Sequence, residues 1–122
     1  MALNPGNFNI KMDIKLDDHS PEVIAAVENA ISRGLDAIGE HAVGHAKDII
    51  LAAGRVDTGR MLNSIDSRTG DRMVIVGTNV EYAPYHEFGT SRGISAIWFL
   101  RKGIGDHLEE YKNLLKDSLE NA

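Results

Sequence analysis

The feature that most constrains this chain is a long central stretch without a helix breaker, from Pro21 to Ala53. Ser20 offers a side-chain oxygen as an N-cap, and Pro21 suits a first helical position because its missing N–H has no partner there. Apolar residues recur along one face at helical spacing. They are Val23, Ile24, Val27, Ile31, Leu35, Ile38, Ala42 and Ile49. The sequence therefore predicts one helix over residues 21–53.

A helix of that length runs roughly 50 Å, which exceeds the width of a domain built from 122 residues. Three glycines interrupt it, at Gly34, Gly39 and Gly44. Each weakens the helix by up to about 1 kcal/mol relative to alanine. We expect them to mark a bend, or places where another backbone comes close.

The rest of the chain indicates an α+β domain, with a small antiparallel sheet packed against the long helix and a C-terminal helix. Alternating polar and apolar residues predict a strand over residues 8–16. A hairpin is expected over residues 64–78, with its turn at residues 69–71. The C-terminal helix is expected over residues 106–120, where Asp106 and Glu109 form a capping pattern. With no linker or repeat, residues 1–122 form a single domain.

An aromatic motif followed by a loop occupies residues 80–98. Tyr82 to Phe88 is too short and too polar for a strand, and we expect one helical turn there. Residues 89–97 are expected to form a mobile loop. Aromatic side chains in such a segment more often anchor a core or a protein interface than carry chemistry. His86 and Glu87 could form an acid–base pair, but no nucleophile accompanies them.

Composition excludes several classes of function. There is no cysteine, so the chain has no disulfide framework and no thiolate metal site. The net charge of −5 argues against sequence-independent binding of nucleic acid. No apolar run approaches the roughly 20 residues of a membrane span, and the first residues do not resemble a signal peptide. We therefore expect no membrane association and no cofactor.

Two patterns could carry chemistry. Asp57-Thr58-Gly59 is the triplet of a dimeric retroviral-type aspartic protease, in which two aspartates share one proton. That protease is almost entirely β, whereas this triplet follows a helix, so we favour Asp57 or Thr58 as a cap of the next helical turn. His41 and His45 are spaced to reach one metal ion from a helix. Because no third ligand stands out, we favour packing against the core.

Three segments together resemble the tail-completion, or neck, proteins of long-tailed bacteriophages. They are Val56-Asp-Thr-Gly-Arg-Met-Leu-Asn-Ser-Ile65, Val76-Gly-Thr-Asn-Val-Glu-Tyr-Ala-Pro-Tyr-His-Glu-Phe-Gly-Thr90 and Phe99-Leu-Arg101. The resemblance covers roughly residues 20–120. Each motif is weak alone, but their order and spacing are specific. The family often has proline on both sides of the third motif, where this chain has Trp98 and Lys102.

The resemblance implies a tail-terminator-like fold and a structural role without catalytic residues. Such subunits assemble as a ring, commonly a hexamer, that joins the connector, adaptor or stopper proteins to the tail-tube or tail-terminator protein. DNA passes through the lumen without specific binding. The expected location is the virion tail or neck, and the host cytoplasm during assembly. The candidate motif and interface residues are Asp57, Thr58, Gly59, Tyr82, Tyr85, Glu87, Phe88, Gly89, Thr90, Trp98, Phe99 and Arg101.

The resemblance also suggests roles for the long helix, the loop and the negative net charge. The excess length of the 21–53 helix can pack against a neighbouring subunit, and the loop can order on docking. An acidic lumen repels DNA and keeps it sliding. Candidates for that wall are Glu22, Glu28, Asp36, Glu40 and Asp48. The alternatives are the aspartic protease and an oligomeric adaptor unrelated to phage.

Overall fold

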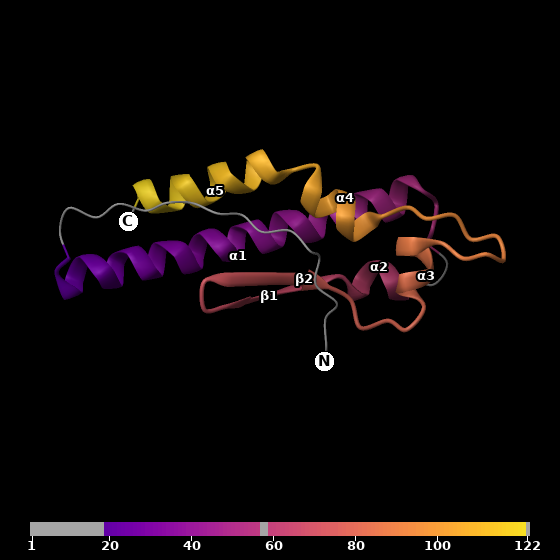
Figure 1. Ribbon diagram of the computed structural model, residues 1–122, viewed down its shortest axis with the longest axis horizontal. Helices are drawn as coiled ribbons and strands as arrows, with labels where there is room; N and C mark the ends of the chain where they lie inside the picture. Colours follow the sequence, from indigo (N-terminus) through magenta and orange to yellow (C-terminus); the bar gives the residue numbers. More distant parts are fainter. Residues whose placement is uncertain (1–18, 57–58, 122) are drawn as a thin grey trace.

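The computed structural model describes residues 19–56 and 59–121, and the strand predicted over residues 8–16 lies outside them. Helices dominate, and a single hairpin forms a two-stranded sheet within the described residues. In chain order the elements are α1 (Pro21–Ala52), α2 (Arg60–Ser64), β1 (Asp66–Gly70), β2 (Met73–Gly77), α3 (Ala83–Phe88), α4 (Phe99–Gly105) and α5 (Leu108–Glu120) (Figure 1). The α+β class predicted from the sequence is confirmed.

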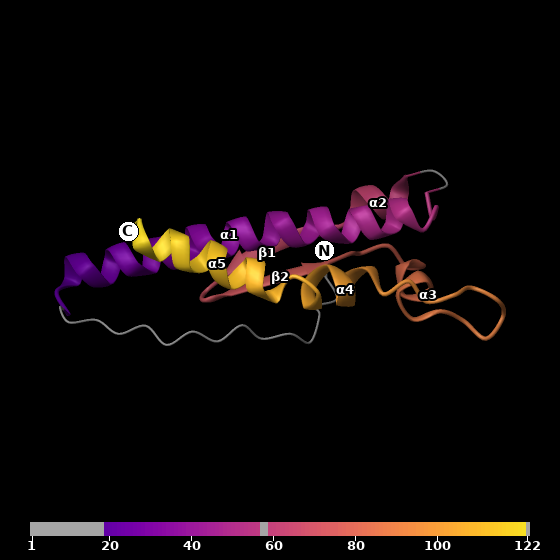
Figure 2. The ribbon, with the colours of Figure 1, turned by 90° about the horizontal axis from the view of Figure 1, so that it is seen from above.

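The long helix α1 runs along most of the length of the molecule, and the loop that follows α3 extends beyond its end (Figures 1 and 2). It begins as predicted: Pro21 is its first residue, and the Ser20 Oγ accepts a hydrogen bond of 3.3 Å from the Val23 N–H. It ends at Ala52, and Gly54 follows the cap residue with a positive φ of 69°. The helix expected over residues 21–53 is confirmed to within one residue.

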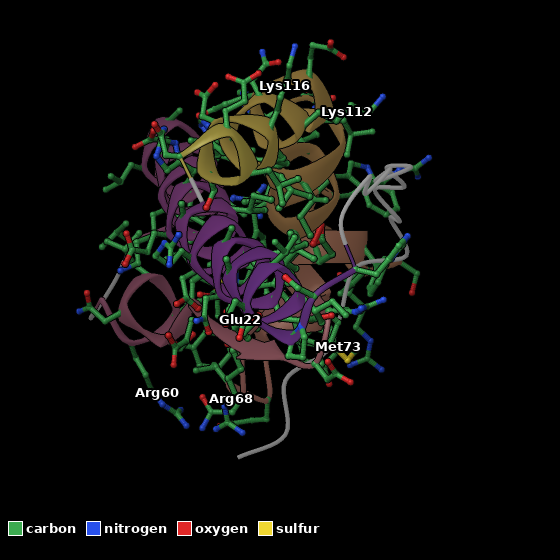
Figure 3. All side chains as sticks on the ribbon, turned by 90° about the vertical axis from the view of Figure 1, so that its left-hand side faces the viewer. Glu22, Arg60, Arg68, Met73, Lys112 and Lys116 are labelled. Atoms are coloured by element: carbon green, nitrogen blue, oxygen red, sulfur yellow. The ribbon has the colours of Figure 1, made fainter. Side chains whose placement is uncertain are left out.

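Helix α1 lies between two layers, with the antiparallel helix α5 on one side and the hairpin on the other (Figures 1 and 3). Glycines bring both layers close. A Cβ on Gly34 would lie 2.8 Å from Leu115 Cδ1 on α5, and one on Gly39 would lie 2.6 Å from Ser67 Oγ on β1. The close approach of another backbone is confirmed at Gly34, where the Cβ would lie 3.3 Å from the Leu115 Cα, whereas the atoms nearest to Gly39 belong to side chains. Nothing lies within 4 Å of a Cβ on Gly44.

The hairpin pairs β1 and β2 in antiparallel register, from Asp66 opposite Gly77 to Gly70 opposite Met73. Its turn consists of residues 71–72, and Arg72 has a φ of 54°. The turn was expected at residues 69–71, so the prediction was wrong by about one residue. Val76 is buried and Val74 packs against the core, so the apolar strand supplies the inner face.

The C-terminal third differs from the sequence prediction. Residues 99–105 form a separate helix, α4, and Asp106 ends it: its N–H donates to the Lys102 carbonyl. The backbone of Asp106 is helical (φ −79°, ψ −7°), whereas an N-cap residue requires a non-helical conformation. His107 takes the N-cap position of α5. The capping role predicted for Asp106 is therefore wrong.

One core holds these elements together, and Tyr111, Phe99 and Ile50 are its largest fully buried side chains. Tyr111 is on α5, Phe99 is on α4 and Ile50 is on α1, so the core joins three helices. Helix α5 turns one apolar face to this core: Leu115 is also buried, and Leu108, Leu114 and Leu119 pack against the core. None of the helices in the described part of the chain could span a membrane.

Candidate functional site

The second and third sequence motifs meet at the carboxylate of Glu87. This side chain on α3 is only 4% exposed. Its Oε2 accepts a hydrogen bond of 2.9 Å from the Leu100 N–H, and its Oε1 accepts one of 3.4 Å from the Arg101 N–H. The first N–H groups of a helix have no partner inside the helix. Glu87 therefore caps α4, and it ties the second motif to the third.

Burial and hydrogen bonding act on Glu87 in opposite directions. Burial raises the pKa of Glu87, and the Leu100 and Arg101 N–H groups partly offset that rise. The net direction is upward. Among the described residues, the partners of the carboxylate are backbone N–H groups, and His86 Nδ1 instead contacts the Arg55 guanidinium at 3.0 Å. The acid–base pair considered for His86 and Glu87 does not form.

The segment between α3 and α4 is closed at its base by backbone hydrogen bonds. The Ile97 and Trp98 N–H groups donate to the carbonyls of His86 and Glu87, at 2.9 Å and 3.2 Å. Gly89 sits in this base with a φ of 78°, and a Cβ there would lie 2.9 Å from the Ala96 nitrogen. Only glycine fits both the conformation and the space. Residues 89–98 consequently project from the end of the molecule as a loop (Figures 1 and 2).

The tip of this loop is also ordered by hydrogen bonds. The Thr90 N–H donates to the Ile94 carbonyl at 2.8 Å, and the Thr90 Oγ1 accepts from the Ile94 N–H at 3.2 Å. Further back, the Arg55 guanidinium donates to the Ser95 carbonyl at 3.1 Å. These contacts give the loop a defined shape within the isolated subunit.

The first motif joins the second through side-chain contacts. Arg60 binds the Glu81 carboxylate with two hydrogen bonds of 3.0 Å and 2.9 Å, and its guanidinium lies 5.5 Å from the centre of the Tyr82 ring. Ser64 and Thr78 share a hydrogen bond of 2.6 Å. Gly59 is the N-cap residue of α2, with a φ of 82°. Asp57 and Thr58, predicted to cap this helix, lie outside the described residues.

The aromatic residues of the motif divide into an inner and an outer set. Tyr82 is half-buried and packs against the core, and Phe99 is fully buried. Tyr85 and Phe88, three residues apart on α3, are 54% and 65% exposed. Trp98 packs edge-on against Phe88, with ring centres 5.5 Å apart, and the Arg101 guanidinium lies 5.3 Å from the Trp98 ring centre. Anchoring within the subunit thus applies to Tyr82 and Phe99 and not to Tyr85 or Phe88.

A cavity of about 650 Å³ opens beside the first motif and is bordered by Arg55, Arg60, Tyr82 and His86. Val56, Met61 and Leu62 add apolar side chains to its lining. The helix-rich fold around the cavity differs from the almost entirely β fold that the aspartic-protease alternative requires.

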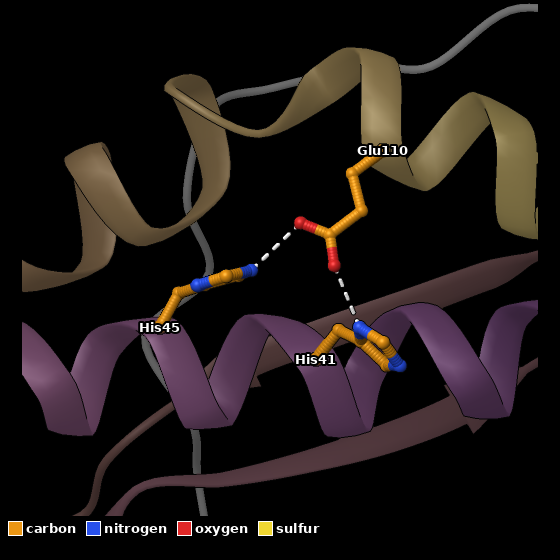
Figure 4. A group of neighbouring side chains, drawn as sticks. All are labelled: His41, His45 and Glu110. Carbon is orange, nitrogen blue, oxygen red and sulfur yellow. Dashed lines mark hydrogen bonds and ion pairs between the residues drawn. The ribbon is translucent and has the colours of Figure 1, made fainter.

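A second cluster of polar side chains lies away from this end, between α1 and α5 (Figure 4). His41 Nδ1 lies 2.7 Å from Glu110 Oε1, and His45 Nε2 lies 2.7 Å from Glu110 Oε2. The two imidazoles lower the pKa of Glu110. Sequence spacing identified the histidine pair but missed Glu110, because α5 brings in this residue from 65 positions beyond His45. The three residues could together hold a metal ion.

Comparison with known proteins identifies the family. Residues 11–89 match the family described as "Bacteriophage HK97-gp10, putative tail-component". No curated protein and no solved structure matches the chain. The matched segment contains α1, the hairpin and the aromatic motif on α3, and it ends before α4. It covers well over half of the chain, which therefore belongs to the HK97-gp10-like family of bacteriophage tail components.

Proposed function

We propose that this chain is a structural subunit of a ring at the head–tail junction of a long-tailed bacteriophage. The ring joins the connector, adaptor or stopper proteins to the tail-tube or tail-terminator protein, and DNA passes through it without specific binding. The chain performs no catalysis in this role. The observation that carries the proposal is the pair of exposed aromatic side chains, Tyr85 and Phe88, inside the segment that defines the family.

Exposed aromatic side chains of this size are characteristic of protein interfaces. Tyrosine and phenylalanine are enriched at the buried centres of interfaces, where each contributes a large contact area. Tyr85 and Phe88 share one face of α3, and Trp98 extends that face. We define Tyr85, Phe88 and Trp98 as the aromatic patch. In the ring, the aromatic patch of one subunit packs against the adjacent subunit.

The first turns of α1 supply a second contact. Ile24 is 43% exposed, and Val23, Val27 and Ile31 are only partly covered. These residues belong to the apolar face that the sequence predicts. Their incomplete burial within the subunit supports packing against a neighbour, as expected for a helix that is longer than its own domain.

The charge of α1 supports an acidic lumen. Glu22, Asp36, Glu40 and Asp48 are all exposed, as is Arg33. Glu28 differs, because Arg72 binds its carboxylate and neutralises it. A surface with excess negative charge repels the phosphates of duplex DNA and allows it to slide. We expect the four exposed carboxylates, and not Glu28, to contribute to the wall.

The basic side chains of α5 favour the same orientation. Lys112 and Lys116 extend from α5 on the opposite side of the molecule from Arg60 and Arg68 (Figure 3). Glu22 lies toward the side of the two arginines, and the two lysines lie away from it. The lysines of α5 are therefore accessible to the outer surface of the ring and to its partners.

The proposal is tested by the assembly state of variants. Native mass measurement of the purified chain, alone and mixed with candidate tail-tube and connector subunits, should show a closed oligomer. Replacing Tyr85 and Phe88 together by serine should shift this species toward monomer while circular dichroism stays unchanged. The matched control is Met73→Ser, which removes a side chain of similar exposure, 51%, from the hairpin (Figure 3).

Two results would contradict the proposal. The first is a double serine variant that assembles as well as the unaltered chain. The second is a reconstruction of the neck in which the channel lining is basic, or in which this chain is present as a single copy.

A further inference from the structure

We propose that His41, His45 and Glu110 form a binding site for a divalent transition-metal ion of the zinc type, and that the ion clamps α5 onto α1. The site is independent of the aromatic patch and of the ring proposed above. It is drawn in Figure 4, where both imidazoles and the carboxylate point into the space between the two helices.

The geometry of the three side chains favours a single ion. Their ligand atoms all lie within 4.8 Å of one another. Zinc binds imidazole nitrogen at about 2.0–2.1 Å and carboxylate oxygen at about 2.0–2.2 Å, usually with four ligands. Rotation of the glutamate and of the partly exposed histidines can bring the three groups closer around an ion. A water molecule completes the coordination.

The donor set determines which ions fit. Two imidazole nitrogens and one carboxylate oxygen suit zinc and its neighbours in the first transition series. Magnesium and calcium prefer shells made entirely of oxygen, and two imidazoles do not supply one. The site should therefore bind zinc, cobalt and nickel and discriminate against magnesium.

The exposure of the three side chains and the orientation of the His45 ring also suit metal binding. The side chains of His41, His45 and Glu110 are 47%, 26% and 34% exposed, so an ion can enter without opening the core. The His45 ring stacks on His107, with ring centres 3.5 Å apart and planes 4° from parallel. Stacking holds the His45 ring in place, since rotation would break the contact. Parallel rings cannot aim their in-plane lone pairs at one ion, so His107 is a positioning residue and not a ligand.

Binding requires both imidazoles to present a lone pair to the ion. Each neutral imidazole does so when its proton is on the ring nitrogen that faces away from the ion, and no oxidation or reduction takes place. Because His41 and His45 lie on α1 and Glu110 lies on α5, the bound ion links two helices that are far apart in sequence. The chain has no cysteine and cannot form a disulfide, so the bound ion is what would cross-link these two helices.

The test uses the full chain without a histidine tag, freed of metal by dialysis against a chelator. Calorimetric titration with zinc chloride should give one ion per chain. A free zinc concentration of a hundred times Kd should raise the melting temperature by roughly 10 °C. Cobalt should produce a visible absorption band of tetrahedral or five-coordinate type. Magnesium should change neither the melting temperature nor the heat signal.

The decisive comparison is between cluster variants and a matched histidine variant. His45→Gln and Glu110→Gln keep side-chain size, and they should weaken zinc binding by roughly a hundred-fold or more, because even partners outside the ligand shell are worth about 10–100-fold. His19→Gln removes an exposed histidine outside the cluster and should bind zinc like the unaltered chain. Circular dichroism of each metal-free variant verifies that it is folded.

The proposal is overturned if the folded, unaltered chain takes up no zinc. It is equally overturned if zinc raises the melting temperature of the His45→Gln, Glu110→Gln and unaltered chains by the same amount. In either case the Glu110 carboxylate acts only as a polar partner of His41, His45 and His107, whose Nδ1 lies 3.5 Å from it.

Discussion

Two regions of the molecule are held by different kinds of contact. In the packed half, α1, α4 and α5 join through small residues: Gly34 lets Leu115 approach α1, and Gly103 lets α4 approach Ala46. In the second half, formed by α2, α3 and the 89–98 loop, polar side chains bind backbone groups: Glu87 accepts from the first N–H groups of α4, and Arg55 donates to the Ser95 carbonyl. Close packing fixes the shape of the subunit in the packed half. Hydrogen bonding in the second half holds the loop and the aromatic patch outside the core.

The two regions also differ in what we expect them to do: the packed half stabilises the fold, and the aromatic patch takes part in assembly. The family motifs gather in the second half, where Tyr85 and Phe88 remain exposed. Helix α5 lies beyond the segment that matches the family model. If the contrast is correct, substitutions in the packed half should change stability, and substitutions on the aromatic patch should change assembly.

The largest expected effect compares two tyrosines. Tyr111 on α5 is fully buried and donates a hydrogen bond to the Gly103 carbonyl, whereas Tyr85 is 54% exposed. Tyr111→Ala should lower the free energy of unfolding by about 3–5 kcal/mol, the usual cost of removing a buried aromatic ring. Tyr85→Ala should change it by no more than about 0.5 kcal/mol. Urea denaturation of the isolated subunits measures both, and similar losses at the two positions would break the comparison.

The next effect concerns the cap on α4. Glu87→Ala leaves the Leu100 and Arg101 N–H groups without their acceptor and should cost about 1–3 kcal/mol. Glu87→Gln keeps one acceptor oxygen and should cost less. Urea denaturation of the two variants provides the measurement. Equal stability of the alanine and glutamine variants would show that the carboxylate does not support α4.

A smaller effect distinguishes two glycines of α1. Gly44→Ala meets nothing within 4 Å and should stabilise the chain by up to about 1 kcal/mol, the difference in helix propensity. Gly34→Ala gains the same propensity but places a Cβ 3.3 Å from the Leu115 Cα. Overpacking typically costs about 1–3 kcal/mol, so the net result should be a loss of about 1 kcal/mol. Thermal melts of the two variants should therefore move in opposite directions, and a stabilised Gly34→Ala variant would contradict the close packing.

The smallest effect is the pH dependence of the Glu87 junction. Because burial raises the pKa of Glu87, the folded chain binds a proton there more tightly than the unfolded chain does. The contribution of Glu87 to stability is therefore greatest at low pH. It declines as the pH rises from the ordinary carboxyl pKa through the raised one, and it is constant above that. The difference in stability between the unaltered chain and Glu87→Gln, measured across this range, should follow that direction.

The sequence predicted the elements that depend on local chemistry. The Ser20 cap, the uninterrupted apolar face of α1 and the β-prone residues of β2 are local signals, and the structure confirms each of them. The prediction for Asp106 failed because a capping pattern contains no information about the preceding helix. Helix α4 exists because a carboxylate on α3 caps it from 13 residues away, and no local pattern predicts such a contact.

The candidate sites show the same limit. The motif residues were identified in sequence, but only the tertiary structure shows that Glu87 points inward while Tyr85 and Phe88 point outward. His41 and His45 are one turn apart and were recognised as a pair. Their partner Glu110 comes from a different helix, so periodicity along α1 could not predict it.

The closed base of the 89–98 loop has a mechanical consequence. Because hydrogen bonds fasten both of its ends to α3 and the Arg55 guanidinium holds Ser95, a force applied at the tip is passed to α3 and to the segment that follows α1. The tip, around Ser91 and Arg92, is exposed and can change in length or sequence while the base keeps its geometry. The length of the loop tip can thus change while the rest of the subunit keeps its structure.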